Sequence, residues 1–383
     1  MTSTMPAELP LNLHEYEAAA RELLPPAVWG YVASGSGDEV TLRGNRAAFG
    51  RWRLLPRILA GVREVSTATT VLGQEIAFPV VIAPSGRHAL CHDEGERATA
   101  RAAKAAGTVY TMSSAASFAI EAIAPEAGPW WFQLYVFTDR GFTRDLIERA
   151  AAAGASALVV TVDVPVRARR EGEQRVRFAT EAGMAMARLG GSSDALAAMD
   201  EAADAGQVQT TFDSTFGWHD LDWLASLSPL PILLKGILHP DDARMAVEYG
   251  VRGVIVSNHG GRQLDHAVAS LDALLAVAAA VGGRAEVLLD GGVRRGSDVL
   301  LALALGARAV LIGRPIHWGL AVGGEAGVHH VLALLRAELA RDLMLCGLAS
   351  PAAIDRSLLV PADGVVDGGS EPPGRWAMDS GGS

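Results

Sequence analysis

The chain has 383 residues, half of them hydrophobic, and a formal net charge of −10. This acidic balance argues against nucleic acid or an anionic membrane as a general partner, although a local basic pocket can still bind a small anion. The two cysteines, Cys91 and Cys346, stand far apart and indicate neither a disulfide framework nor a cysteine metal site. No apolar run approaches the ~18 residues of a membrane span, and the N-terminus lacks signal-peptide features. We therefore expect a cytoplasmic protein without a bound metal.

The N-terminal region predicts two helical pieces. Helical spacing runs from Leu13 to Leu24, Pro25-Pro26 interrupts it, and it resumes before the Ser34–Gly37 turn. Residues 38–77 indicate a mixed, loop-rich segment. We divide the chain into a flexible N-terminus (residues 1–10), one domain (residues 11–360) and a Gly-, Pro- and Ser-rich, disordered tail (residues 361–383).

Short β-rich runs then alternate with Ala-rich helical patterns. Glycines stand between helix and strand at Gly107, Gly154, Gly250 and Gly306, as expected for left-handed helix C-termini. Eight strands alternating with helices predict a parallel (β/α)₈ TIM barrel. An open doubly wound sheet is the alternative, but no Gly-x-Gly-x-x-Gly fingerprint supports it. The eight runs are Phe78–Pro84, Thr108–Ser113, Trp130–Tyr135, Ala157–Asp163, Pro231–Gly236, Gly253–His259, Glu286–Gly291 and Ala309–Gly313.

A long loop separates the fourth strand from the fifth, from about Arg170 to Trp218. An insertion after a barrel strand lies on the active-site face and often acts as a mobile lid. We expect this one to do so.

Polar residues stand at the C-terminal end of every predicted strand, where barrels place functional groups. Packing alone does not account for this pattern, because a buried polar group without a partner costs ~1–3 kcal/mol. The strand-end residues are Ser85 and Gly86, Ser113 and Ser114, Gln133 and Tyr135, Thr161 and Asp163, Lys235, Ser257 and His259, Asp290, and Gly313 with Arg314.

Glycine-rich turns after the last two strands predict a phosphate site. Each turn opens a helix, where backbone N–H groups and neighbouring arginines bind phosphate, and barrels commonly place phosphate there. Ordinary glycine turns with surface arginines are the alternative. The candidate residues are Asp290, Gly291, Gly292, Arg294, Gly313 and Arg314.

The stretch Ser257–Asp265 combines His259, two glycines and Arg262 directly after a buried strand. Histidine titrates near neutrality and arginine offers a planar fork to a carboxylate. An exposed turn is the alternative. Together with Asp290–Gly296, Gly313–Pro315 and Phe132–Tyr135, this stretch resembles the FMN-dependent 2-hydroxy acid oxidases and dehydrogenases, such as glycolate oxidase, lactate oxidase, mandelate dehydrogenase and hydroxymandelate oxidase.

The resemblance covers about residues 16–359 and implies FMN, an L-2-hydroxy acid substrate, a 2-keto acid product, O₂ or another electron acceptor, and a homotetramer or homo-octamer. The α-hydrogen would pass to flavin N5, as a hydride or by way of a carbanion. Matched residue by residue, His259 is the base and Asp163 its partner, Arg262 and Arg170 grip the substrate carboxylate, and Tyr31 and Tyr135 bind or polarise the substrate. The same match would place Lys235 beside the N1 and O2 atoms of the flavin. The flavin ring would contact Ser113, Gln133, Thr161 and Ser257, and the phosphate would be held by Arg294, Gly313 and Arg314.

Departures from the family pattern bear on the substrate. Ala115 replaces a bulky tryptophan of glycolate oxidase and widens the predicted pocket, which favours a bulky or aromatic, mandelate-like substrate. Gly86 resembles the mandelate dehydrogenase type and leaves the acceptor open. Arg87 and Arg167 are charged where relatives more often carry apolar or neutral residues. We expect both to face solvent; the alternative is that they bind an additional anionic group of the substrate.

Two other function classes fit an FMN barrel. One is an isomerase of the type 2 isopentenyl diphosphate isomerase kind, and the other is a non-catalytic phosphate- or flavin-binding protein. The predicted carboxylate clamp and the His259–Asp163 pair argue against both.

Overall fold

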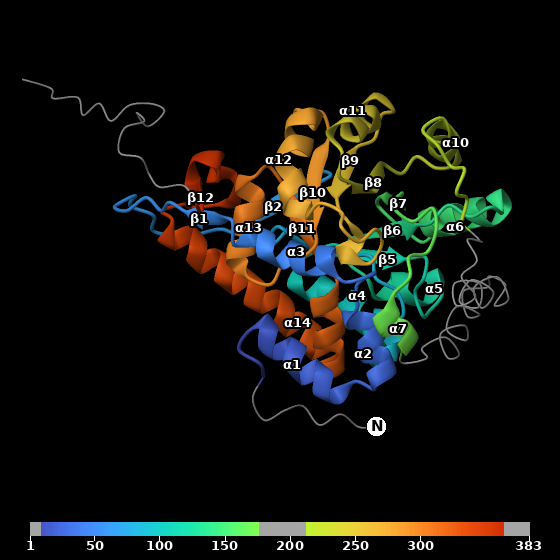
Figure 1. The fold of residues 1–383 in the computed structure, drawn as a ribbon, viewed down its shortest axis with the longest axis horizontal. Coiled ribbons are helices and arrows are strands. Elements are labelled where there is room, and N and C mark those ends of the chain that lie inside the picture. Colours follow the sequence, from blue (N-terminus) through green and yellow to red (C-terminus); the bar gives the residue numbers. More distant parts are fainter. Residues whose placement is uncertain (1–8, 176–211, 364–383) are drawn as a thin grey trace, which may run out of the picture.

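The computed structural model describes residues 9–175 and 212–363, and its centre is a closed barrel of eight parallel strands (Figure 1). The strands lie in the order β10-β11-β4-β5-β6-β7-β8-β9, so the predicted (β/α)₈ barrel is confirmed. The barrel strands are β4 (Val80–Ile82), β5 (Tyr110–Ser113), β6 (Trp130–Leu134), β7 (Leu158–Thr161), β8 (Ile232–Ile237), β9 (Gly253–Val256), β10 (Glu286–Asp290) and β11 (Ala309–Ile312).

Helices pack around the barrel and alternate with its strands, as the sequence predicted. The glycines predicted between helix and strand, Gly107, Gly154, Gly250 and Gly306, all have positive φ. The helices are α4 (Gly95–Ala106), α5 (Ile120–Ile123), α6 (Arg140–Ala152), α7 (Glu171–Arg175), α10 (Asp220–Leu227), α11 (Pro240–Glu248), α12 (Ser270–Val281), α13 (Gly296–Ala304) and α14 (Arg314–Leu345).

Each barrel strand separates two apolar layers because successive side chains point to opposite faces. Val81, Val159 and Leu233 belong to the cluster that fills the barrel interior. Val80 and Ile82 belong to the larger cluster beneath the helices. Burial on both faces explains why the strands are nearly continuous apolar runs, and it leaves the strand ends as the place for polar groups.

The segment before the barrel contains more structure than the sequence indicated. Helices α1 (Leu13–Leu23) and α2 (Pro26–Ala33) confirm the predicted break at the two prolines. The expectation of a loop-rich segment over residues 38–77 was wrong in part, because α3 (Val40–Phe49) and the short strands β1 (Trp52–Leu54), β2 (Thr69–Val71) and β3 (Gln74–Ile76) lie there. Helix α3 was hard to recognise because it contains Gly44 and has no side-chain N-cap.

Helix α3 matters for the site because it packs beside the turn after β9. Asn45 and Asn258 exchange two side-chain hydrogen bonds of 2.8 Å, and Asp265 accepts a bond from the backbone N–H of Thr41 at 2.9 Å. The N-terminal region therefore holds the Ser257–Asp265 stretch in place.

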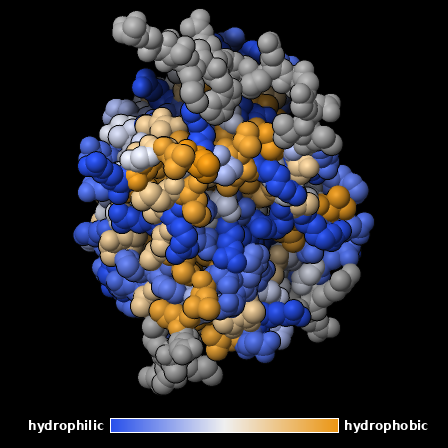
Figure 2. Space-filling model, turned by 90° about the vertical axis from the view of Figure 1, so that its left-hand side faces the viewer, coloured by the Kyte–Doolittle hydropathy of each residue, from blue (hydrophilic) through white to orange (hydrophobic). Residues whose placement is uncertain are grey.

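The last strand, β12 (Leu359–Pro361), pairs with β1 at one side of the molecule (Figure 1). The face on that side carries patches of apolar side chains among charged ones (Figure 2). In the segment after β1, Leu55, Ile58 and Leu59 are largely exposed. Within the two described ranges, no helix combines the length and hydropathy that a membrane crossing requires. Most of the predicted lid lies outside the described residues.

Candidate functional site

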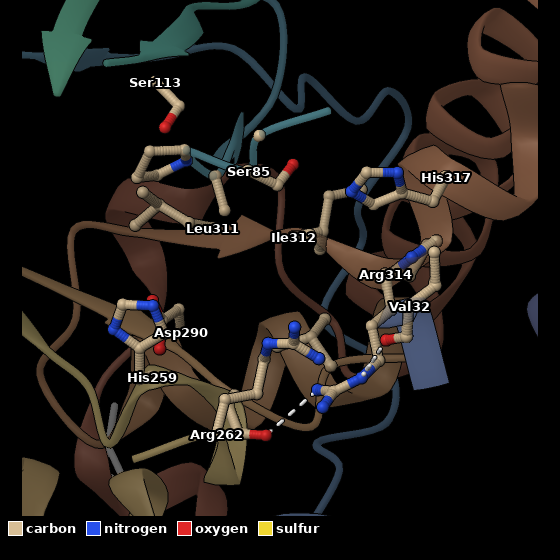
Figure 3. A pocket seen from close by; sticks show the side chains of 18 of the residues that line it. Val32, Ser85, Ser113, His259, Arg262, Asp290, Leu311, Ile312, Arg314 and His317 are labelled. Carbon is tan, nitrogen blue, oxygen red and sulfur yellow. Dashed lines mark hydrogen bonds between the residues drawn. The ribbon is translucent and has the colours of Figure 1, made fainter. Parts of the chain in front are cut away.

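A cavity opens at the C-terminal ends of the barrel strands, and fifteen of the predicted site residues line it (Figure 3). Strand ends supply most of them, α2 supplies Tyr31, and the segment after β7 supplies Arg170. The lining residues that the sequence predicted are Tyr31, Ser85, Gly86, Ser113, Tyr135, Arg170, Lys235, His259, Arg262, Asp290, Gly291, Gly292, Arg294, Gly313 and Arg314.

Three further predicted residues stand directly behind this lining. Asp163 contacts His259, Ser257 contacts Lys235, and Gln133 accepts a 2.9 Å hydrogen bond from the Ser113 hydroxyl. Thr161 lies elsewhere, in the wall of a neighbouring cavity that shares Tyr135 with the first. It remains close in register, because it pairs with Lys235 across β7 and β8.

His259 and Asp163 form a buried hydrogen-bonded pair. The Nδ1 atom of His259 lies 3.0 Å from Oδ1 of Asp163, so Nδ1–H donates to the carboxylate and Nε2 keeps a lone pair. Burial is the largest influence and holds the pKa of His259 below its usual value, despite the opposing charge of Asp163. Burial is the largest influence on Asp163 and would raise its pKa, but His259 and Lys235 together outweigh burial and lower that pKa. A neutral imidazole beside an ionised carboxylate can act as a general base.

Local backbone geometry brings these two side chains together. His259 itself has φ 58°, which is uncommon for a residue with a side chain and is often found at functional sites. Strand β8 carries a register irregularity between Lys235 and Ile237, and Gly236 there has φ 115°. A Cβ atom on Gly236 would lie 2.6 Å from Cβ of Asp163. A glycine is therefore required for Asp163 to occupy its position.

Lys235 lies toward the C-terminal end of β8, lines the cavity and has two oxygen partners. Its Nζ is 3.0 Å from Oδ2 of Asp290 and donates a 2.9 Å hydrogen bond to the Ser257 hydroxyl. Burial opposes the charged form, but the carboxylates of Asp290 and Asp163 outweigh it and raise the pKa of Lys235. Lys235 is therefore a fixed positive charge at the base of the cavity.

Arg262 and Arg170 place two guanidinium groups in the same cavity. Arg262 donates to the carbonyls of Tyr31 and Ser34 at 2.7 and 2.9 Å, and Arg170 donates to the Arg262 carbonyl at 3.2 Å. Burial, followed by the charge of Arg170, lowers the pKa of Arg262 to about 10. An anion bound between the two guanidinium groups would reduce their mutual repulsion, and a carboxylate matches the geometry of their planar forks.

Arg87 and Arg167 do not face solvent, so that expectation was wrong. Arg87 is 8% exposed, and its guanidinium lies 5.4 Å from the centre of the Tyr31 ring. Arg167 is partly buried and donates a 2.7 Å bond to Glu173, which also accepts a 3.1 Å bond from Arg170. Aromatic faces and a buried carboxylate hold these side chains inward.

The glycine-rich turns after β10 and β11 lie on one wall of the cavity together with Arg294 and Arg314. Burial lowers the pKa of Arg294 to about 10 and that of Arg314 to about 9. Arg314 donates to the backbone carbonyls of Val32, Ser34 and Gly260, which fix its orientation. Figure 3 shows Arg314 beside Val32. This wall combines positive charge with the glycine turn after β10 and the N-terminus of α14, as a phosphate requires.

The donors in the cavity fit FMN. The side-chain nitrogen of Gln133 is buried and has no hydrogen-bond partner among the described residues, so it can donate to a bound polar group. Lys235 supplies positive charge near the strand ends, and the glycine turns supply a phosphate site. FMN would thus be held by Gln133, Ser113 and Lys235 at its ring end and by Arg294, Arg314 and the glycine turns at its phosphate.

Three site residues were missed by sequence reasoning. Glu173 joins Arg167 to Arg170, His317 lines the cavity, and His88 lies behind Ser85. A glutamate three residues after Arg170 gave a weak signal of an ion pair. Isolated histidines gave none, because only the fold brings them to the cavity.

Comparisons with known proteins agree with this geometry. Residues 20–361 match the FMN-dependent dehydrogenase family model. An L-lactate oxidase of Nostoc sp. is 49% identical over 91% of this chain and 98% of the relative. Glycolate oxidase 5 of Oryza sativa subsp. japonica is 46% identical over 91% of this chain and 95% of the relative.

Solved structures give the same result. A crystal structure of mandelate oxidase is 41% identical, with a TM-score of 0.83 over 92% of this chain and 98% of that chain. A mandelate oxidase variant with (S)-mandelic acid has a TM-score of 0.82 and 40% identity over 93% of this chain and 100% of that chain. The chain therefore belongs to the family of FMN-dependent 2-hydroxy acid oxidases and dehydrogenases and is an oxidoreductase that uses FMN.

Proposed function

We propose that this protein oxidises L-2-hydroxy acids with a bulky or aromatic, mandelate-like side chain, and that His259 is the base. One observation carries the proposal: the imidazole paired with Asp163 shares a single cavity with the guanidinium groups of Arg170 and Arg262. The family assignment favours oxidation over the isomerase and non-catalytic alternatives.

The residues divide the reaction among themselves. Arg262 and Arg170 bind the substrate carboxylate, and Nε2 of His259 removes the hydroxyl proton. Asp163 stabilises the imidazolium that this transfer creates. Burial raises the pKa of Tyr135 to about 12, so its hydroxyl stays protonated and can donate to the substrate oxygen. When bound, FMN would supply the acceptor for the α-hydrogen and the two electrons that leave the α-carbon.

Small residues support a substrate with a large side chain. Gly86 and Ala115 both line the cavity, and a Cβ atom on Gly86 would lie 2.5 Å from the Ala115 carbonyl oxygen. A side chain on Gly86 would collide with Ala115, so residue 86 must stay small, and Ala115 itself adds only a methyl group to this wall. The structural likeness to a mandelate oxidase that contains (S)-mandelic acid agrees with this choice.

Anaerobic bleaching of the flavin by a panel of 2-hydroxy acids tests the proposal. The panel contains glycolate, lactate, mandelate and hydroxy acids with a second carboxylate, and air is admitted afterwards to test O₂ as acceptor. We expect the fastest bleaching with L-mandelate. If glycolate bleaches faster than mandelate, the substrate assignment is wrong, and if no 2-hydroxy acid bleaches the flavin, the reaction assignment is wrong. Preferred bleaching by the dicarboxylates would assign Arg87 and Arg167 to a second anionic group.

We also propose that the barrels assemble into a homotetramer or homo-octamer. The exposed side chains of Leu55, Ile58 and Leu59 support an interface. Light scattering coupled to gel filtration measures the mass directly, and a monomer of 40.0 kDa would exclude assembly.

A further inference from the structure

His88 lies buried directly behind the cavity wall formed by Ser85. It begins a short 3₁₀ helix, His88–Leu90, and is 0% exposed. Its Nε2 atom is 2.8 Å from the Ser85 hydroxyl oxygen, and its Nδ1 atom is 2.9 Å from the Thr99 hydroxyl oxygen. The His88 ring also packs edge-on against His317, with ring centres 4.6 Å apart. The reaction described above uses neither histidine.

The hydrogen bonds around His88 determine which nitrogen carries its proton. The Thr99 hydroxyl donates its single proton to the carbonyl of Gly95, at 3.3 Å. With that proton directed to Gly95, we infer that the Thr99 oxygen accepts from Nδ1–H of His88. Burial lowers the pKa of His88, so the ring is neutral and has only one N–H. Nε2 then keeps a lone pair and accepts the proton of the Ser85 hydroxyl.

We propose that His88 is a positioning residue that makes Ser85 a hydrogen-bond acceptor toward bound FMN. A free serine hydroxyl can donate or accept, but the Ser85 proton is directed to His88, away from the cavity. Ser85 thus offers lone pairs to the cavity that it lines (Figure 3). FMN supplies matching donors in its ring N–H and its ribityl hydroxyl groups. The inference rests on FMN binding in this cavity.

The surrounding turn fixes the backbone position of His88. The buried carboxylate of Glu96 accepts 2.9 Å bonds from the backbone N–H groups of His88 and Ser117. Arg87, directly before His88, has φ 63° and reverses the chain there. The imidazole is held from both sides, as a group that sets the polarity of a neighbour must be.

A double-mutant cycle on FMN affinity tests the proposal. The dissociation constant is measured from the fluorescence of released FMN, without any hydroxy acid, in Ser85→Ala, His88→Leu and the double variant. Each single variant should weaken binding about three- to tenfold, because Ser85→Ala removes the acceptor and His88→Leu leaves the Ser85 hydroxyl without a fixed orientation. The double variant should bind FMN no more weakly than the single variant with the lower affinity, because both changes act on the same hydrogen bond. The proposal would be overturned if the fold-changes of the two single variants multiply in the double variant, or if His88→Leu leaves FMN affinity unchanged.

Two further variants separate polarity from packing. Thr99→Val keeps both His88 and Ser85 but removes the acceptor of Nδ1–H, so it should weaken FMN binding in the same direction. Ser117→Ala is the matched control, because Ser117 bonds Glu96 under the same turn but does not contact the His88 ring. Its FMN affinity should equal that of the unchanged protein. If Thr99→Val leaves FMN affinity unchanged, or if Ser117→Ala weakens it as much, the turn acts by packing alone.

Nitrogen-15 NMR of histidine-labelled holoenzyme reads the tautomer directly and does not depend on any variant that fails to fold. We expect the His88 proton on Nδ1 at pH 7. A proton on Nε2, shared with an oxygen of Ser85, would overturn the proposal. Failure of the proposed function is a separate result. If the variants change FMN affinity as expected but no hydroxy acid bleaches the flavin, the proposed function is refuted and the role of His88 still holds.

Discussion

The two sides of the cavity differ in the origin of their residues. On the side of the base, His259, Asp163 and Lys235 lie at or just after the ends of adjacent strands, and their partners come from the same barrel rim. On the side of the arginines, Arg262 still follows β9, but Arg170 and Glu173 come from the segment after β7, where α7 packs against α2. The ends of barrel strands therefore position the base and its partners, whereas a connecting segment supplies Arg170 and Glu173.

This difference separates chemistry from selectivity. A closed sheet fixes distances between strand ends, so a proton-transfer pair placed there keeps its geometry. Segments outside the sheet can vary in length and charge without disturbing the barrel. We expect changes on the base side to lower the rate of flavin reduction, and changes on the arginine side to alter the affinity for substrate.

The largest expected effect comes from His259→Ala. Loss of the base should slow flavin reduction by substrate about 10²- to 10⁴-fold, with FMN still bound. Anaerobic stopped-flow spectroscopy measures this rate directly. The comparison breaks if the variant reduces its flavin at the normal rate, since proton removal would then belong to another group.

Asp163→Asn tests whether the carboxylate acts through the imidazole. The amide oxygen carries no negative charge, so it accepts a weaker hydrogen bond from Nδ1–H of His259 and no longer stabilises the imidazolium. We expect a fall of about 10²-fold or more in the reduction rate, with a smaller change in KM. A pH profile shows whether the apparent pKa of the base has fallen, as removal of the negative charge demands. An unchanged profile would contradict the assigned pairing.

The sequence predicted the barrel and its strand-end residues because both follow from local rules. Apolar runs, helix-ending glycines and polar residues after each run are visible along the chain, and the Ser257–Asp265 motif is contiguous. The side chains of Arg87 and Arg167 could not be placed in this way. Their burial depends on Tyr31 and Glu173, which only the folded chain brings near them. His88 and Ser85 are close in sequence, but the Thr99 contact that gives their bond its direction is tertiary.

Arg170→Lys tests the arginine side with a conserved charge. Lysine lacks the planar fork, so KM for the hydroxy acid should rise about tenfold while the reduction rate at saturation falls less. Arg167→Lys is the matched control, because Arg167 shares Glu173 with Arg170 but is absent from the residues that line the cavity. Equal effects of the two changes on KM would mean that Glu173, not the cavity, is the partner that matters.

The smallest expected effect is on stability and concerns the buried histidines of both sides. Burial lowers the pKa of His259, His88 and His317 in the folded chain. Unfolded histidine titrates near ~6.5, so below that pH the unfolded chain binds protons that the folded chain does not. The free energy of unfolding must therefore fall as the pH drops from about 7.5 toward 5.5. Urea unfolding of the FMN-free protein at constant ionic strength measures the slope. His88→Gln should flatten it, whereas His239→Gln, whose side chain is 64% exposed, serves as the matched control. A slope that His88→Gln leaves unchanged would mean that His88 binds its proton equally in the folded and unfolded chain, so that folding does not hold the ring neutral as the role of His88 requires.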